Sequence, residues 1–240
     1  MANLSGDAKQ TYVADLFARI AGRYDLMNSL MTGGMHHGWK RVTARLTADG
    51  LTGSALDVAT GTGDLAYALS RRDGIEHSVG IDLLPEMIVL AQGKKAAAAD
   101  SDRVAFLVGD ALSLPFPDGA FACATAGFSL RNMPDLPQAI SEMARVVRPG
   151  GRVTTLELTP MAPGIKTSLF RLYFHGVVPL IGQLVTGDRT AYTYLPQSVD
   201  YFLQADRLAG LFAQVGLENV GYRKLGFGSV AIHYGTKPLG

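Results

Sequence analysis

The sequence has almost no cysteine and no excess of charge of either sign. Cys123 is the one cysteine among 240 residues, so an intramolecular disulfide and a multi-cysteine zinc site are both excluded. Lysine and arginine total 22 against 21 aspartate and glutamate residues, which gives a formal charge of +1. A surface that neutralises the phosphates of duplex DNA needs a clear basic excess. We therefore expect no nucleic-acid partner.

The sequence also lacks a secretion signal and a long uninterrupted apolar run. The first ten residues are polar and contain no apolar core, so we expect a cytoplasmic protein. The most apolar stretch, 169–185, contains Arg171, His175 and Pro179 and is shorter than the roughly 20 residues that a membrane span needs. We therefore expect no transmembrane helix. Hydrophobic residues make up 48% of the chain and charged residues 18%, a composition typical of a folded globular domain.

Short apolar runs separated by helical patterns predict the fold. Five of these runs have the composition of buried strands: 55–59, 78–81, 104–108, 121–126 and 153–158. Their alternation with helical segments indicates a parallel sheet with helices on both faces and right-handed crossovers. Two more strands, 217–224 and 229–237, are joined by Gly226-Phe227-Gly228, which has the turn chemistry of a hairpin. We predict a Rossmann-like α/β fold whose seven-stranded sheet is mostly parallel and ends in an antiparallel hairpin.

Several helices can be predicted from their starts and their apolar faces. Pro85 suits a first helical turn, and Asp135 with Gln138 three residues later resembles a capping box. A helical region is expected over 165–185, followed by a tyrosine-rich loop and a helix over 206–215. The chain length allows one α/β domain to bury a full core, so all these elements should belong to a single domain.

A glycine-rich turn follows the first predicted strand. The segment 56–64 runs from an apolar strand through Gly61, Thr62 and Gly63 into a helix. Ligands of this fold class lie beyond the carboxyl ends of the strands, so the turn should line a ligand site. Asp82, about 20 residues later at the end of the second strand, can accept hydrogen bonds from both hydroxyls of a ribose. Together these features indicate a ligand that contains adenosine.

Two cofactors that contain adenosine are compatible with this pattern of residues. Gly61, Gly63 and Ala66 also satisfy the dinucleotide pattern G-x-G-x-x-A, so NAD stays an alternative. Asp110, at the end of the third strand, is placed to accept the amino group of adenine, which a dinucleotide site does not require. Asp64 at a helix start would repel a pyrophosphate but tolerate a cationic sulfonium. These two carboxylates favour S-adenosylmethionine.

Two long signatures resemble the menaquinone and ubiquinone biosynthesis methyltransferases, a family that C-methylates a polyprenylated quinol ring. The first is Tyr24-Asp25-Leu26-Met27-Asn28 followed by Thr32, His36 and Trp39, with threonine where the family has serine. The second is Arg145-Val146-Val147-Arg148-Pro149-Gly150-Gly151 ending in Glu157-Leu158-Thr159, where arginine and threonine replace lysine and serine. Leu114-Pro115-Phe116-Pro117-Asp118 and Leu130-Arg131-Asn132 also match. The resemblance spans nearly the whole chain and implies a class I methyltransferase that uses S-adenosylmethionine and no metal.

The resemblance implies a set of binding residues for the cofactor. The family's contacts fall on Thr62, Asp82 and the Asp110-Ala111 pair, and we add Gly61, Gly63 and Leu83 from the same two turns. One contact does not carry over. Some members place a binding serine where this chain has Gly127, and Ser129 stands where they have glycine. That wall of the site stays unassigned.

The resemblance also implies which residues line the quinol: Arg131, Asn132, Tyr24, Asp25 and His36. The intrinsic pKa of an arginine is too high for an easy proton acceptor, so Arg131 is expected to stabilise the quinolate. His36 is the better base on chemical grounds. Three of these residues could instead have a purely structural role. His36 and Tyr24 are also compatible with packing in the core, and Asp25 with capping a helix.

The domain organisation implied by the resemblance has two additions to the sheet. We expect a helical cap over 1–50 and a helical insertion over 160–205 that covers the substrate. A polyprenyl tail is insoluble in water, so contact with the inner face of the membrane is expected for part of this cover. The sequence leaves open a naphthoquinol or a benzoquinol substrate and a monomer or a homodimer. The competing classes are an NAD-dependent oxidoreductase and a nucleoside-binding module without catalysis.

Overall fold

The computed structural model describes residues 6–95, 101–162, 164–187 and 189–239. Seven strands form one sheet in the order β3-β2-β1-β4-β5-β7-β6. Their bounds are β1 Gly53–Val58, β2 Ile75–Asp82, β3 Val104–Val108, β4 Phe121–Gly127, β5 Val147–Leu158, β6 Glu218–Leu225 and β7 Val230–Thr236. The first five strands pair in parallel, and β7 runs antiparallel to both β5 and β6. The predicted fold class is confirmed.

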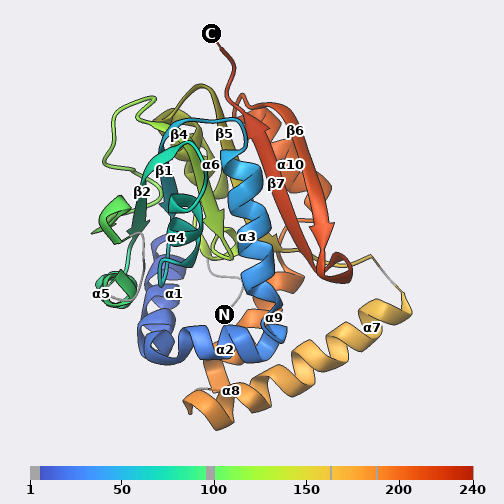
Figure 1. The fold of residues 1–240 in the computed structure, drawn as a ribbon. Helices are drawn as coiled ribbons and strands as arrows, with labels where there is room; N and C mark the ends of the chain where they lie inside the picture. The colour runs from blue at the N-terminus through green and yellow to red at the C-terminus, as the bar shows by residue number, and fades with distance from the viewer. Residues whose placement is uncertain (1–5, 96–100, 163, 188, 240) are drawn as a thin grey trace.

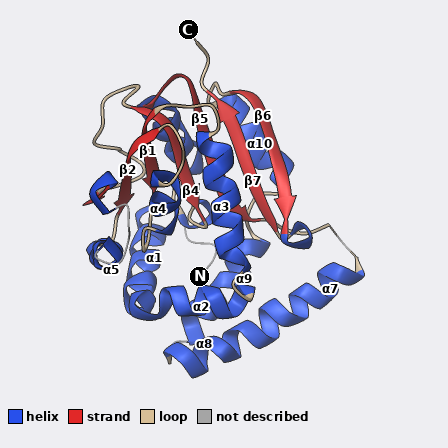
Figure 2. Cartoon of the chain, viewed as in Figure 1, coloured by secondary structure: helices blue, strands red, loops and turns tan. Residues whose placement is uncertain are grey.

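The helices cover both faces of this sheet and one of its ends (Figures 1 and 2). Their bounds are α1 Gly6–Ile20, α2 Tyr24–Thr32, α3 Met35–Ala48, α4 Asp64–Ser70, α5 Pro85–Lys95, α6 Leu136–Val146, α7 Ile165–Leu172, α8 Val178–Thr186, α9 Arg189–Asp200 and α10 Ala205–Gln214. The main core joins the sheet to α6 and α10, while a smaller apolar cluster packs α3 and α4 against β1 and β4. Strands buried on both faces have continuous apolar runs, which is why they could be found in the sequence.

A separate apolar cluster lies beyond the carboxyl ends of the parallel strands. It joins α1, α2, α8 and α9 through buried side chains that include Leu16, Met27, Phe174 and Tyr192. Figure 1 shows these helices gathered at the lower end of the sheet. The cluster therefore builds a helical layer over the edge where ligands of this fold class bind.

Two local expectations were wrong. The tyrosine-rich segment is the helix α9, not a loop, because Tyr192 and Tyr194 are buried in the apolar cluster and tertiary packing decides its conformation. The capping box is only half formed. Asp135 accepts a hydrogen bond from the backbone N of Gln138 at 3.0 Å. The Gln138 side chain donates to the carbonyl of Leu112, whereas a full capping box would have it accept from the backbone N–H of Asp135.

The helical region after β5 is longer than its apolar stretch indicated. α7 and α8 form one continuous run through a π-helical segment, Tyr173–Val177. Within the described residues, 167–185 is one helix that is long and apolar enough to cross a membrane by length and composition, with a mean hydropathy of 1.2, and 22% of it is buried. The expectation that this stretch is too short for a span was therefore wrong. Its inner face, which includes Phe174 and Val178, packs in the apolar cluster with α9.

Candidate functional site

A first cavity of about 830 Å³, counting its open part, lies at the carboxyl ends of β1, β2, β3 and β4. Five of the seven expected cofactor residues line it: Gly61, Asp82, Leu83, Asp110 and Ala111. Its far wall comes from α1, which contributes Gln10, Val13 and Phe17. Thr62 and Gly63 do not line this cavity. Gly63 instead has a packing role, since it adopts φ 84° and a Cβ there would lie 2.7 Å from the Phe106 ring.

Asp82 fixes the glycine turn as well as facing the cavity. Its Oδ2 accepts a hydrogen bond from the Gly61 backbone at 2.7 Å, and its Oδ1 accepts one from the Leu84 backbone at 3.0 Å. Burial raises the pKa of Asp82, and the backbone donors at Leu84 and Gly61 act in the opposite direction. Each carboxylate oxygen can accept a further hydrogen bond, so both remain able to bind ligand hydroxyls.

Asp110 is held by the N-terminal helix. Its Oδ1 accepts a hydrogen bond from the Leu112 backbone at 2.9 Å, and its Oδ2 accepts one from Gln10 Nε2 at 3.1 Å. Gln10 thus occupies one oxygen of the carboxylate that the sequence assigned to the amino group of adenine. The neighbouring Gly109 lets the chain pass close to β2, since a Cβ there would lie 2.5 Å from the Ile81 side chain.

Asp25 and Thr62 belong to an ion-paired network beside the glycine turn. Thr62 Oγ1 donates to Asp25 Oδ1 at 2.6 Å and accepts from Lys94 Nζ at 2.9 Å. Lys94 also pairs with Asp25 and Asp64, both at 2.6 Å, and Lys40 pairs with Asp64 at 2.7 Å. Burial alone would raise the pKa of Asp64, but the two lysines outweigh it and hold that pKa well below its usual range. The network ties α2 and α3 to the glycine turn and to α5.

A second cavity adjoins the first and is larger and mostly apolar. It has a volume of about 1290 Å³, counting its open part, and shares Phe17, Tyr24 and Phe128 with the first cavity. Its walls come from α1, α2, α3, the π-helical segment and α9. The expected quinol residues Tyr24, His36 and Arg131 line it, whereas Asn132 lines the first cavity and Asp25 lines neither.

Arg131 is held at the boundary of the two cavities by a buried ion pair that the sequence analysis did not find. Its Nη1 lies 2.6 Å from Glu157 Oε1 and also donates to the carbonyl of Phe128. The Arg131 backbone N donates to Glu157 Oε2 at 3.2 Å, and the side chain of Glu157 is 1% exposed. Nε of Arg131 is buried without a hydrogen-bond partner among the described residues. The signal was present in the sequence, since Glu157 belongs to the segment Glu157-Leu158-Thr159 with which the second signature ends.

Asn132 connects the cavities on the other side of Arg131. Its Oδ1 accepts a hydrogen bond from the Tyr194 hydroxyl at 3.2 Å, and Tyr194 lines the second cavity from α9.

The wall of the first cavity that the sequence left unassigned contains Gly127 and Ser129. A Cβ at Gly127 would lie 2.4 Å from a terminal methyl of Leu65, so a serine there would require the Leu65 side chain to shift. Ser129 lines the cavity, and its buried Oγ has no partner within the described part of the chain.

His36 is buried in the wall of the second cavity. Its Nε2 lies 3.1 Å from Ser29 Oγ, and Nδ1 is buried without a partner among the residues described. Burial, followed by the charge of Lys40, lowers the pKa of His36 to about 4. The imidazole is therefore neutral at physiological pH, so it can accept a hydrogen bond, but it is a weaker base than its intrinsic pKa indicates.

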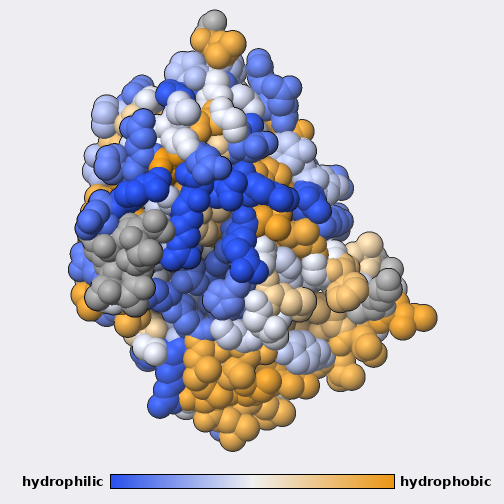
Figure 3. Space-filling view, viewed as in Figure 1, coloured by the Kyte–Doolittle hydropathy of each residue, from blue (hydrophilic) through white to orange (hydrophobic). Residues whose placement is uncertain are grey.

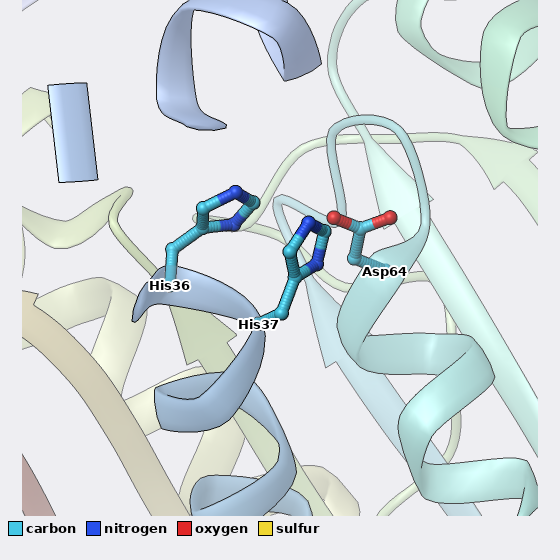
Figure 4. A group of neighbouring side chains, drawn as sticks. All are labelled: His36, His37 and Asp64. Carbon is cyan, nitrogen blue, oxygen red and sulfur yellow. The ribbon is translucent and has the colours of Figure 1, made fainter. Parts of the chain in front are cut away.

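His36, His37 and Asp64 also lie close enough together to be considered as metal ligands (Figure 4). One ligand atom from each falls within 4.8 Å of the others. Figure 4 shows both histidines on the first turn of α3, with Asp64 at the start of α4. Lys40 and Lys94 already pair with Asp64, so a divalent cation could use that carboxylate only by competing with both ion pairs. Asp64 therefore belongs to the ion-paired network, and the two histidines lie beside it.

Solved structures of known proteins share this fold. A [4+2]-cyclase, SpnF, matches with a TM-score of 0.72 at 20% identity, covering 98% of each chain. A SAM-dependent methyltransferase from Thermotoga maritima matches with a TM-score of 0.67 at 16% identity, covering 93% of this chain and 99% of its own. At these identities the likeness shows the fold alone, and the cyclase illustrates that the fold hosts more than one reaction. The protein has the Rossmann-like fold of the class I methyltransferases.

Sequence comparison identifies the family. The model of the ubiE/COQ5 methyltransferase family matches residues 5–237, so the chain belongs to that family and is a methyltransferase. A demethylmenaquinone methyltransferase from Deinococcus radiodurans is 44% identical over 94% of this chain and 92% of its own. One from Thermus thermophilus is 42% identical over 93% of this chain and 100% of its own. A ubiquinone/menaquinone biosynthesis C-methyltransferase from Dinoroseobacter shibae is 38% identical over 96% and 92%. The suggested resemblance is confirmed.

Proposed function

We propose that this chain transfers a methyl group from S-adenosylmethionine to a ring carbon of a polyprenylated quinol. The observation that carries the proposal is the pair of adjoining cavities. The first has carboxylates at the strand ends, the second is large and apolar, and Phe17, Tyr24 and Phe128 belong to both. A polar cofactor and an apolar acceptor bound in these cavities would meet at the three shared aromatic side chains.

The residues of the first cavity fit an adenosine cofactor. The free lone pairs of Asp82 suit the ribose hydroxyls, Asp110 suits the adenine amino group, and the partnerless Oγ of Ser129 offers one more polar contact. NAD is the less suitable ligand because the cavity that adjoins the first is mostly apolar, which does not suit a second, charged nucleotide. When bound, the sulfonium supplies an activated methyl group.

The chain's own residues would orient and activate the quinol. The Arg131 guanidinium, held by Glu157, places positive charge at the boundary of the cavities, where it would stabilise a quinolate oxygen. Neutral His36 would accept a hydrogen bond from a quinol hydroxyl through Nδ1. The aromatic walls would exclude water and hold the ring against the cofactor, and such alignment can supply roughly 7 to 11 kcal/mol. The relatives at 42 to 44% identity are named demethylmenaquinone methyltransferases, which makes a naphthoquinol the first substrate to test.

The outer face of α7 and α8 supports peripheral contact with a membrane. Leu169, Leu172, Leu180 and Leu184 are all more than half exposed and recur on one side of the helical run. Figure 3 shows hydrophobic residues gathered over the lower part of the molecule, where Figure 1 places α2 and α8. Because the opposite face of the run is packed against the protein, we propose that it lies on the bilayer surface of a cytoplasmic enzyme and does not span it.

The direct test is a methylation assay with purified protein. Deuterated-methyl S-adenosylmethionine is incubated with reduced demethylnaphthoquinol and, separately, with a 2-methoxy-6-alkyl benzoquinol, and the products are analysed by mass spectrometry. A ring-bound deuterated methyl group on either quinol supports the proposal, and the ratio of the two products identifies the substrate class. Calorimetric binding of NAD with none of S-adenosylmethionine would overturn it. Binding of the cofactor without turnover of any quinol would favour a nucleoside-binding module.

A further inference from the structure

The second cavity opens to the surface at two apolar side chains. Among the described residues that line it, only Met35 and Phe227 are largely exposed to solvent, with exposed fractions of 50% and 84%. Met35 starts α3, and Phe227 is the middle residue of the turn Gly226–Gly228 between β6 and β7. Residues far apart in the sequence thus form one mouth, and both present hydrocarbon to the outside.

Phe227 is held in an unusual backbone conformation. It adopts φ 57° and ψ 20°, the left-handed region that a bulky side chain rarely occupies. The preceding Gly226 packs on Trp39, since a Cβ at Gly226 would lie 3.0 Å from that ring. The turn is therefore fixed against the body of the protein while its phenyl group points outward. Strain of this kind persists where the surrounding structure enforces it, and it clusters at ligand sites.

The helical run that begins with α7 also contributes to this cavity. Phe170 and Tyr173 line the cavity, and Leu169 and Leu172 on the same helical run are 69% and 71% exposed. One side of this run therefore faces the cavity and the other side faces outward. The wall that this run gives to the cavity and the face that it turns outward are therefore both apolar.

We propose that Met35 and Phe227 form the exit for the prenyl tail of the quinol and that both side chains contact the hydrocarbon of a lipid bilayer. The ring enters the protein, and the tail stays in the lipid. This inference rests on the proposed function, because it assigns the tail of that substrate. It makes Phe227 a residue for binding long-tailed substrates with no part in the chemistry at the ring.

The test compares tailed and tailless substrates. Phe227→Gly and Phe227→Asp are assayed with a long-tailed demethylnaphthoquinol in vesicles of phosphatidylethanolamine and phosphatidylglycerol, and with a tailless, water-soluble quinol. Phe227→Gly relieves the left-handed strain, so the fold is retained. The matched control is Leu239→Asp, an apolar residue 83% exposed next to the C-terminus at the opposite end of the molecule (Figure 1).

We expect both Phe227 variants to raise the KM for the tailed quinol by about tenfold or more, because a phenyl group no longer contributes burial in lipid, and to leave the tailless reaction unchanged. Leu239→Asp should match the parent with both substrates. Equal loss with both substrates, or no loss with either, would overturn the tail exit. A parent dimer that Phe227→Asp converts to monomer in sedimentation would show that a second copy covers the mouth, and would also overturn it. A parent that methylates no quinol refutes the proposed function itself.

Discussion

The two cavities of this protein are built in different ways. The first is formed by turns that follow parallel strands, and its key polar atoms are fixed by backbone hydrogen bonds such as those of Asp82 to Gly61 and Leu84. The second is formed by side chains from α1 to α3 near the N-terminus and from α7 to α9 much later in the sequence, with an apolar cluster behind them. The difference teaches that the polar groups of the first cavity are fixed mainly by the sheet, whereas the shape of the second cavity depends on how the helical layer packs.

The boundary between the cavities is where the two kinds of construction meet. Arg131 and Asn132 belong to one short turn after β4, yet Arg131 faces the apolar cavity and Asn132 faces the polar one. Each is held by a residue from another element, Glu157 of β5 and Tyr194 of α9. A change at this boundary should therefore have larger effects than a change inside either cavity.

Arg131→Ala should separate methyl transfer from cofactor binding and give the largest effect. Because the side chain is proposed to stabilise the quinolate and does not line the first cavity, we expect cofactor affinity close to the parent and a loss of roughly 10² to 10³ in kcat. Glu157 would be left charged and unpaired in the interior, which should lower the free energy of unfolding by about 3 to 5 kcal/mol. Calorimetric titration, single-turnover rates and urea denaturation measure the three quantities.

Two companion variants distinguish charge, geometry and folding. Arg131→Lys keeps the positive charge without the planar fork of donors, so partial recovery of rate would indicate electrostatics and no recovery would indicate geometry. Arg131→Ala combined with Glu157→Gln should recover most of the lost stability and none of the rate. Unchanged turnover in Arg131→Ala would remove this residue from the mechanism and direct attention to Tyr24 and His36.

The pH dependence of the unfolding free energy tests whether His36 is buried and neutral in the wall of the second cavity. Its folded pKa of about 4 lies below the ordinary 6.5, so its contribution to stability is fully present above pH 6.5 and is lost as the pH falls toward 4. The difference in unfolding free energy between the parent and His36→Gln should shrink by up to about 3 kcal/mol over that range. Burial raises the pKa of Asp57 to about 7, so protonation of Asp57 at lower pH increases the stability of the folded protein. This contribution is the same in the parent and in the variant, and it cancels in the difference between them.

His233→Gln is the matched control, since burial also lowers the pKa of His233 to about 4 and this residue lines neither cavity. Both variants should show the same loss of acid sensitivity in urea denaturation at several pH values. Only His36→Gln should change methyl transfer, and the parent rate should stay level on the acid side until the pH approaches 4. A parent rate that falls near pH 6.5 would contradict the neutral, buried imidazole.

Asp82→Ala should weaken the first cavity without affecting the second. Two ribose hydroxyls would lose a charged acceptor, which corresponds to roughly 1.5 to 3 kcal/mol of cofactor affinity. The variant also frees the backbone N of Gly61, so part of the loss comes from a looser turn. Calorimetric titration with S-adenosylmethionine measures the effect, with the exposed Asp118→Ala as the control for loss of one carboxylate. Parental affinity in Asp82→Ala would show that the ribose lies elsewhere.

The sheet and the first cavity were largely predictable because their signals are local. The apolar run 104–108 was located at its observed ends, and Asp82 and Asp110 follow strands whose carboxyl ends must meet at one edge. The sequence could not show that Gln10 reaches Asp110 across 100 residues. Nor could it show that Asp25 and Thr62 pair with each other and with Lys94, because side chains of similar chemistry bind ligands in one fold and form ion pairs in another.

The second cavity was predictable only in part. The family signature named Tyr24, His36 and Arg131, and all three line it. Their surroundings come from tertiary packing. α9 looked like a loop because its tyrosines and Pro196 are weak helix formers, and burial against α1 overrides that propensity. The lowered pKa of His36 likewise depends on burial and on Lys40 one helical turn away.

Gln10→Ala should give the smallest change in cofactor affinity. It tests whether the contact of α1 with Asp110 helps or hinders the binding of S-adenosylmethionine. Gln10 Nε2 donates to Asp110 Oδ2 at 3.1 Å, so an adenine amino group must share or replace that donor. If it replaces the donor, the variant should bind S-adenosylmethionine more tightly by about 1.5 kcal/mol, the lower end of the range for a hydrogen bond to a charged group, because the Gln10–Asp110 bond is only partly buried. Thr11→Ala, on an exposed position of the same helix, should leave the affinity unchanged. Weaker binding in Gln10→Ala would mean instead that Gln10 orients Asp110 for the ligand, and α1 would then be part of the cofactor site rather than its competitor.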